Sequence, residues 1–89
     1  MAVGDVVNDV GADNVILDFQ PAAGVEAVIT SFGSDGGTVP ISLYDGTNRS
    51  LCEAAPMLNI KMFVNNSNYM RIPNAGAGKF NNFTGIQIK

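Results

Sequence analysis

The chain contains no histidine, no tryptophan and one cysteine, Cys52. A single cysteine excludes an internal disulfide, and a bound metal ion would need almost wholly oxygen ligands. The side chain that most often acts as a general base near neutral pH is also missing. We therefore expect no enzyme activity, no cofactor and no catalytic residue. Cys52 has no activating cation near it other than Arg49, so we expect it to be a small buried apolar residue.

Charge is also scarce. Charged residues make up 15% of the 89 residues, and the net charge is −3, whereas an average soluble domain has about 25% charged residues. The five basic residues are scattered along the chain and form no stripe that could neutralise successive phosphates, so we expect no nucleic-acid partner. A surface of neutral polar and apolar groups docks on protein at low desolvation cost. This favours a homo-oligomer or a chain bound in an assembly; a monomer kept soluble by Asn and Gly is the alternative.

Long apolar runs are absent as well. No stretch approaches 18 apolar residues, and the first residues, MAVGDVVNDVG, have no basic region followed by a long apolar one. We therefore expect neither export through a Sec signal nor insertion into a membrane. The single cysteine agrees with folding in a reducing cytosol.

The carboxylates offer little chemistry. Asp5, Asp9 and Asp13 lie near one another in sequence, which raises the question of Ca²⁺, but their spacing is not that of a calcium-binding loop. Turn formation is sufficient to explain Asp13, Asp35 and Asp45. We expect no metal site.

Alternation of apolar and polar residues is clearest in residues 57–74. Every second residue from Leu58 to Val64 is apolar, and the residues between them are polar except for Phe63. Residues 65–68, Asn-Asn-Ser-Asn, favour a turn, and residues 69–72 resume the apolar run. We interpret residues 57–74 as a β-hairpin.

The rest of the chain shows the same short alternating segments, at residues 3–10, 14–20, 25–32, 38–44, 48–53 and 79–89. Asp45-Gly46 is the strongest hairpin signal, and Pro40 indicates a strand at a sheet edge, or at least a position turned away from a partner strand. Apolar residues on both faces of segment 25–32 predict cover from another sheet or subunit. Seven or eight such strands and no helical segment predict one domain over residues 1–89, a small antiparallel β-sandwich or jelly-roll-like barrel. Residues 1–13 form an N-terminal arm or an edge strand in this interpretation.

Several apolar residues are candidates for contact with other proteins. Tyr44 and Phe63 fall on otherwise polar strand faces, while most aromatic residues are needed in the core. The segments at the two ends of a small domain often reach neighbours in an assembly. The interface candidates are Tyr44, Phe63, Val3, Val6, Val7 and Ile88.

Four segments, FQPAAGVEAVITSF, LYDGTNRSL, LNIKMFVNNSNYMRIPN and GIQIK, together resemble small β-sandwich proteins of tailed bacteriophage particles. The resemblance implies a capsid decoration (cement) protein, or a related head-fibre or tail component, made in the host cytoplasm and displayed on the virion. Its partner would be the major capsid protein or another virion protein, and the chain would form an oligomer, with a trimer at a local threefold as one form. The alternative is a virion-surface binding module, whose loops at residues 45–49 and 65–68 contact a host glycan or protein receptor.

Overall fold

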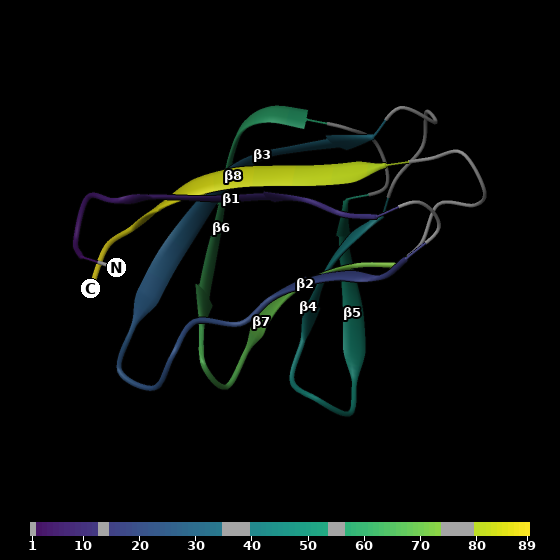
Figure 1. Cartoon of the computed structure of the whole chain (residues 1–89). Coiled ribbons are helices and arrows are strands. Elements are labelled where there is room, and N and C mark those ends of the chain that lie inside the picture. The colour runs from purple at the N-terminus through teal and green to yellow at the C-terminus, as the bar shows by residue number, and fades with distance from the viewer. Residues whose placement is uncertain (1, 13–14, 35–39, 54–56, 74–79) are drawn as a thin grey trace.

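The computed structural model describes residues 2–12, 15–34, 40–53, 57–73 and 80–89, and these form eight β-strands and no helix (Figure 1). The strands are β1 (Val6–Val10), β2 (Leu17–Phe19), β3 (Glu26–Ser34), β4 (Ile41–Tyr44), β5 (Arg49–Glu53), β6 (Met57–Asn65), β7 (Tyr69–Ile72) and β8 (Asn81–Gln87). The predicted all-β class is confirmed.

The strands form two antiparallel sheets of four. Sheet A has the order β1-β8-β3-β6, and sheet B has the order β2-β7-β4-β5. Four of the pairs join β1 with β8, β2 with β7, β3 with β6 and β4 with β5. If the chain is laid out as one long hairpin that contains these four pairs, and this hairpin is then folded into two layers, the two strand orders above result. This is the strand order of a jelly roll. In Figure 1, β1 and β8 run side by side above the β4–β5 hairpin.

The core lies between the inner faces of the two sheets. Because successive side chains of a strand point to opposite faces, each strand supplies alternate residues to it. Ile29 of sheet A and Ile41 and Met70 of sheet B are fully buried. The rings of Phe19 in β2 and Phe83 in β8 lie 5.3 Å apart and connect the layers. The buried core residues are Val7, Leu17, Ala27, Ile29, Phe32, Ile41, Met62, Val64, Met70, Ile72 and Phe83.

β3 contains an irregularity that keeps its apolar residues in the core. Its register with β6 and with β8 shifts between Ile29 and Ser31. In the pairing with β8, β3 advances two residues while β8 advances one. The extra residue, Thr30, turns Phe32 inward, although Phe32 lies three positions after Ile29 and simple alternation would point it outward. Gly85 of β8 lies opposite Ile29, and a Cβ atom there would overlap the backbone of Val28. β8 therefore lies so close to β3 at this position that only glycine fits.

The hairpin predicted for residues 57–74 is wrong. β6 pairs with β3 in sheet A, whereas β7 pairs with β2 and β4 in sheet B. The turn between them is closed by a hydrogen bond from Asn65 N to Asn68 O of 2.9 Å, but it carries the chain from one layer to the other. An Asn-rich turn shows that the chain reverses, and does not show whether it returns within the same sheet.

The β4–β5 hairpin predicted at Asp45-Gly46 is confirmed. Tyr44 pairs with Arg49, and Gly46 has a φ of 96°, a left-handed conformation that glycine adopts readily. The edge position predicted from Pro40 is wrong, because β4 lies between β7 and β5. Pro40 comes just before Ile41, the first residue of β4, so its missing N–H removes no hydrogen bond from the sheet.

Candidate functional site

An apolar row crosses the outer face of sheet A. Val6 of β1 pairs with Ile86 of β8, Ile86 pairs with Val28 of β3, and Val28 pairs with Phe63 of β6. Cross-strand partners of this kind lie on one face of a sheet with their Cβ atoms about 5 Å apart. We call Val6, Ile86, Val28 and Phe63 the apolar row; it extends over all four strands of the sheet.

The row is largely open to solvent. The exposed fraction is 65% for Val6, 64% for Phe63 and 41% for Ile86, whereas Val28, enclosed between Ile86 and Phe63, is 8% exposed. The outer face of an antiparallel sheet that meets water is normally polar. Exposed apolar patches on protein surfaces are common at sites of contact with other molecules, so the apolar row is the candidate contact surface of this chain.

Polar residues border the row on both sides. Asn8 and Thr84 pair on one side of it, and Glu26 and Asn65 pair on the other. Lys89 Nζ lies 3.5 Å from Glu26 Oε2, an ion pair that is well exposed. An apolar centre with a polar rim is the usual composition of a protein–protein interface.

The sequence-based interface candidates have different positions in the fold. Val6 and Phe63 belong to the row, Ile88 is 38% exposed just beyond β8, and Val3 is 68% exposed before β1. Val7 does not lie on the exposed surface, because alternation points it into the core, where it is 5% exposed. Two members of the row, Ile86 and Val28, were missed.

The signals for these two residues were present in the sequence. Ile86 and Ile88 alternate with Gln87 at the end of the chain, and Val28 is on the second apolar face of segment 25–32. Neither signal shows that the two residues are neighbours, because that depends on the pairing of β8 with β3.

Tyr44, the remaining candidate, is part of a cluster on the outer face of sheet B. The Arg71 guanidinium carbon lies 3.8 Å from the centroid of the Tyr44 ring, and Tyr69 meets that ring edge-on at 5.5 Å. Arg71 also donates two hydrogen bonds to the Asp18 carboxylate, from Nε at 2.8 Å and from Nη2 at 2.7 Å. These bonds raise the pKa of Arg71 further above its ordinary value. Tyr44 is half-buried, and Arg71 covers one face of its ring.

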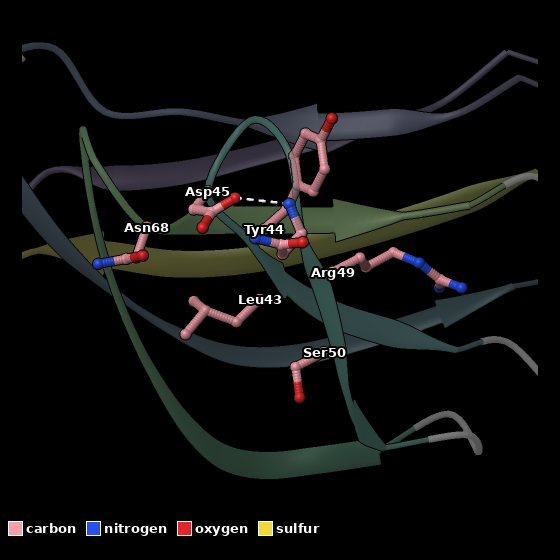
Figure 2. A pocket seen from close by; sticks show the side chains of 7 residues that line it. Leu43, Tyr44, Asp45, Arg49, Ser50 and Asn68 are labelled. Atoms are coloured by element: carbon pink, nitrogen blue, oxygen red, sulfur yellow. Dashed lines mark hydrogen bonds between the residues drawn. The ribbon is translucent and has the colours of Figure 1, made fainter.

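A hollow of about 210 Å³ lies at the loop end of sheet B (Figure 2). Figure 2 shows Leu43, Ser50 and Asn68 around it. In this view the Tyr44 ring extends toward the top and the Arg49 side chain toward the right. Its lining residues are Leu43, Tyr44, Asp45, Asn48, Arg49, Ser50 and Asn68. The structure thus brings together the two loops named above for receptor contact, residues 45–49 and 65–68.

Hydrogen bonds fix both loops. The Asp45 Oδ1 atom accepts the backbone N–H groups of Asn48 at 2.6 Å and Thr47 at 2.9 Å. These bonds, that of Asn48 first, lower the pKa of Asp45 below its ordinary value. In the second loop, Asn65 Oδ1 accepts the backbone N–H of Asn68 at 2.8 Å. Both turns are closed by an acidic or amide side chain at their first residue, so the rim of the hollow is ordered.

The described part of the chain contains no group of three or more His, Cys, Asp or Glu side chains placed to bind a metal ion. Cys52 was expected to be buried and is exposed, because β5 lies at the edge of sheet B and its residues 49–52 are all exposed. Within the same residues, no helix has the length and apolar character needed to cross a membrane.

No protein-family model, no curated protein and no solved structure matches this chain.

Proposed function

We propose that the chain is a non-enzymatic structural protein that binds a protein shell through the outer face of sheet A. The apolar row is the observation that carries this proposal. Apolar area contributes about 25 cal/mol per Å² when it leaves water, and a fully buried Phe side chain contributes about 1.5–3 kcal/mol. Phe63, which is 64% exposed, is therefore the strongest anchor in the row.

The shell in this proposal is the capsid of a tailed bacteriophage, and the resemblance to small virion proteins of such phages supports this choice. The chain would be a capsid decoration (cement) protein, with the major capsid protein or another virion protein as its partner. Jelly rolls are frequent among viral shell proteins, although the fold alone does not determine a function. The chain would stabilise the shell because each bound copy adds interface area that must be separated before the shell opens.

Binding to empty shells assembled from a candidate major capsid protein tests this function. Wild-type chain is expected to co-sediment with the shells and to raise the temperature at which they open. Phe63→Asn is expected to weaken binding about tenfold, because it removes roughly 1.4 kcal/mol of apolar burial. Leu51→Asn is the matched control, since Leu51 is 57% exposed but lies on β5 of the other sheet. Unchanged binding of Phe63→Asn, or an equal loss with Leu51→Asn, contradicts the proposal.

The loop-end hollow supports a second candidate function, that of a virion-surface module binding a host glycan or protein receptor. The hollow combines an apolar wall at Leu43 with hydroxyl and amide groups at Ser50 and Asn68. Such a combination suits a sugar ring, which presents hydroxyl groups at its rim and C–H groups on its faces. Binding to a glycan array that is lost in Asn68→Ala and kept in Asn82→Ala, which changes an amide on β8, would favour this function. Equal signals from the two variants would count against it.

A further inference from the structure

β1 is a free edge of sheet A, and its pairing with β8 is regular from Val6 to Val10. Just outside the strand, Gly11 N donates to Asn81 O at 2.7 Å and Gln87 N donates to Asp5 O at 3.0 Å. Residues 5, 7, 9 and 11 therefore direct their backbone groups toward β8. Because these directions alternate along a strand, Val6, Asn8 and Val10 direct their N–H and C=O groups toward the open edge. At this edge Val10 N donates to the exposed Asp9 Oδ1 atom at 2.8 Å.

We propose that β1 pairs with β1 of a second copy, antiparallel and with Asn8 opposite Asn8 at a twofold axis. This pairing joins the two copies of sheet A into one eight-stranded sheet. It goes beyond the proposed function, because it concerns the strand edge and not the outer face. The backbone groups of residues 6, 8 and 10 of each copy then bond their counterparts in the other, and Val10 N exchanges its bond to Asp9 Oδ1 for one to the Val6 carbonyl of the second copy.

The side chains of β1 complement themselves in this register. Val6, which is 65% exposed, lies opposite Val10 of the second copy, which is 68% exposed, and this contact occurs twice. Asn8 lies opposite Asn8, so two amides that can both donate and accept meet on the axis. Each apolar row then ends on a valine of the neighbouring copy and not in water.

Charge selects this register over its neighbours. With Asn8 on the axis, Asp9 lies opposite Val7 of the second copy and Asp5 lies opposite Gly11. Moving the axis to Val7 places Asp5 opposite Asp9, and moving it to Asp9 places Asp9 opposite itself. Like charges directly opposed across strands are destabilising, so the register centred on Asn8 is favoured over the two registers next to it.

The other three edges of the two sheets are protected by features that β1 lacks. β2 has three residues and is soon followed by Pro21. β5 has a register shift at its pairing with β4, and β6 has both a register shift and the exposed Lys61. Short strands, prolines, bulges and lysines are the usual means by which proteins prevent edge pairing. β1 has no proline, no bulge in its pairing with β8 and no lysine.

The size of the contact predicts a weak dimer. Five residues span about 17 Å, and one pair of added strands buries well under the roughly 1,200 Å² at which stable interfaces begin. A hollow of about 480 Å³ borders the Val10 end of this edge, lined by Asn8, Asp9, Val10, Asn82, Phe83 and Thr84, and offers some further contact area. Association should therefore depend on concentration, and it would be favoured where many copies are held side by side.

Sedimentation velocity of the isolated chain between about 10 μM and about 1 mM tests the proposal. The wild-type chain is expected to pass from monomer to dimer within this range. Asn8→Pro is expected to remain monomeric, because it removes a donor at the open edge and leaves the bonds to β8 intact. Val6→Lys and Val10→Glu are each expected to weaken the dimer at least about tenfold. The double variant places Lys opposite Glu in the stated register and should recover wild-type association to within about threefold.

Two controls keep the outcomes distinct. The unfolding temperatures of the β1 variants should match that of the wild type, since Val6 and Val10 are exposed. Phe63→Asn, on the opposite edge of sheet A, should leave the dimer intact while it weakens shell binding, so failure of one proposal is separable from failure of the other. A wild type that is monomeric at every concentration, a dimeric Asn8→Pro variant, or a double variant as weak as the single ones each overturns the pairing.

Discussion

At the scale of single residues, the tightest constraint in the fold is Gly85. It lies in the second strand of sheet A, faces the core and approaches the bulge of β3 so closely that no side chain fits. Nothing in the local sequence NNFTGIQIK distinguishes this glycine from an ordinary strand interruption. Its necessity comes from the position of a strand some 55 residues earlier in the chain, and only the pairing reveals it.

Gly85→Ala is expected to lower the free energy of unfolding by about 3 kcal/mol, because the added methyl group meets backbone atoms that must move. Gly33→Ala is the control, since a Cβ there meets only the Asn82 side chain at 3.6 Å. That control should change stability by less than about 0.5 kcal/mol. Urea unfolding of both variants gives the comparison, and similar losses in the two would contradict the close approach of β8 to β3.

The two ion pairs among the described residues differ in their geometry and in their exposure to solvent. The Asp18–Arg71 pair is bidentate at 2.7–2.8 Å, stacked on Tyr44 and about one quarter to one third exposed, whereas the Glu26–Lys89 pair is single and far more exposed. We expect Asp18→Asn to cost about 1 kcal/mol after allowance for solvent screening, and Glu26→Gln to cost close to zero. Thermal unfolding at low and high salt measures both. Equal losses of stability in the two variants would show that the bidentate, stacked geometry around Arg71 adds nothing to the free energy of unfolding.

At the scale of elements, the sequence predicted strands more reliably than connections. The alternating pattern located most strands to within a few residues, because burial of one face imposes that period. The turn chemistry located reversals but did not identify their type. Asp45-Gly46 joins paired strands, while the Asn-rich turn at residues 65–68 joins strands of different sheets. The local residues are similar in the two turns, and the difference is decided by which distant strand pairs with each arm.

The β4–β5 hairpin should depend on pH through Asp45. Its lowered folded-state pKa means that the carboxylate contributes stability above the ordinary aspartate pKa of about 3.9, and that this contribution is lost as the pH falls through the lowered value. Asp45→Asn keeps an acceptor oxygen but removes the charge, so its stability should vary less with acid. Unfolding temperatures of the two proteins should differ above about pH 4 and converge below it. If the unfolding temperatures of the two proteins kept a constant difference across this pH range, Asp45 would not be the source of the pH dependence.

For the whole molecule, the proposed function depends on which outer face of the sandwich meets a partner. Sheet A presents the apolar row, and sheet B presents the Tyr44–Arg71–Asp18 cluster, in which the charged and aromatic groups already bind one another. The loop-end hollow belongs to the β4–β5 and β6–β7 loops and is formed largely by sheet B. A chain bound through sheet A would therefore leave the hollow facing the medium.

This arrangement of faces could not be read from the sequence. The fold class follows from the strand pattern, Phe63 follows from its position on an otherwise polar strand face, and Val6 follows from its place in the N-terminal segment. The row that connects them requires the register of β1 with β8, of β8 with β3 and of β3 with β6, which are partners distant in sequence. The composition predicts a surface for protein contact, and only the sheet order shows that exposed apolar residues gather on the outer face of sheet A.

A density map of a shell that carries the bound chain, at a resolution that separates side chains, tests the central claim most directly. We expect the outer face of sheet A to lie against the shell, with Phe63 and Ile86 in contact with it and the β4–β5 hairpin turned to solvent. A map with sheet B against the shell and the apolar row facing solvent would show that binding through sheet A is wrong.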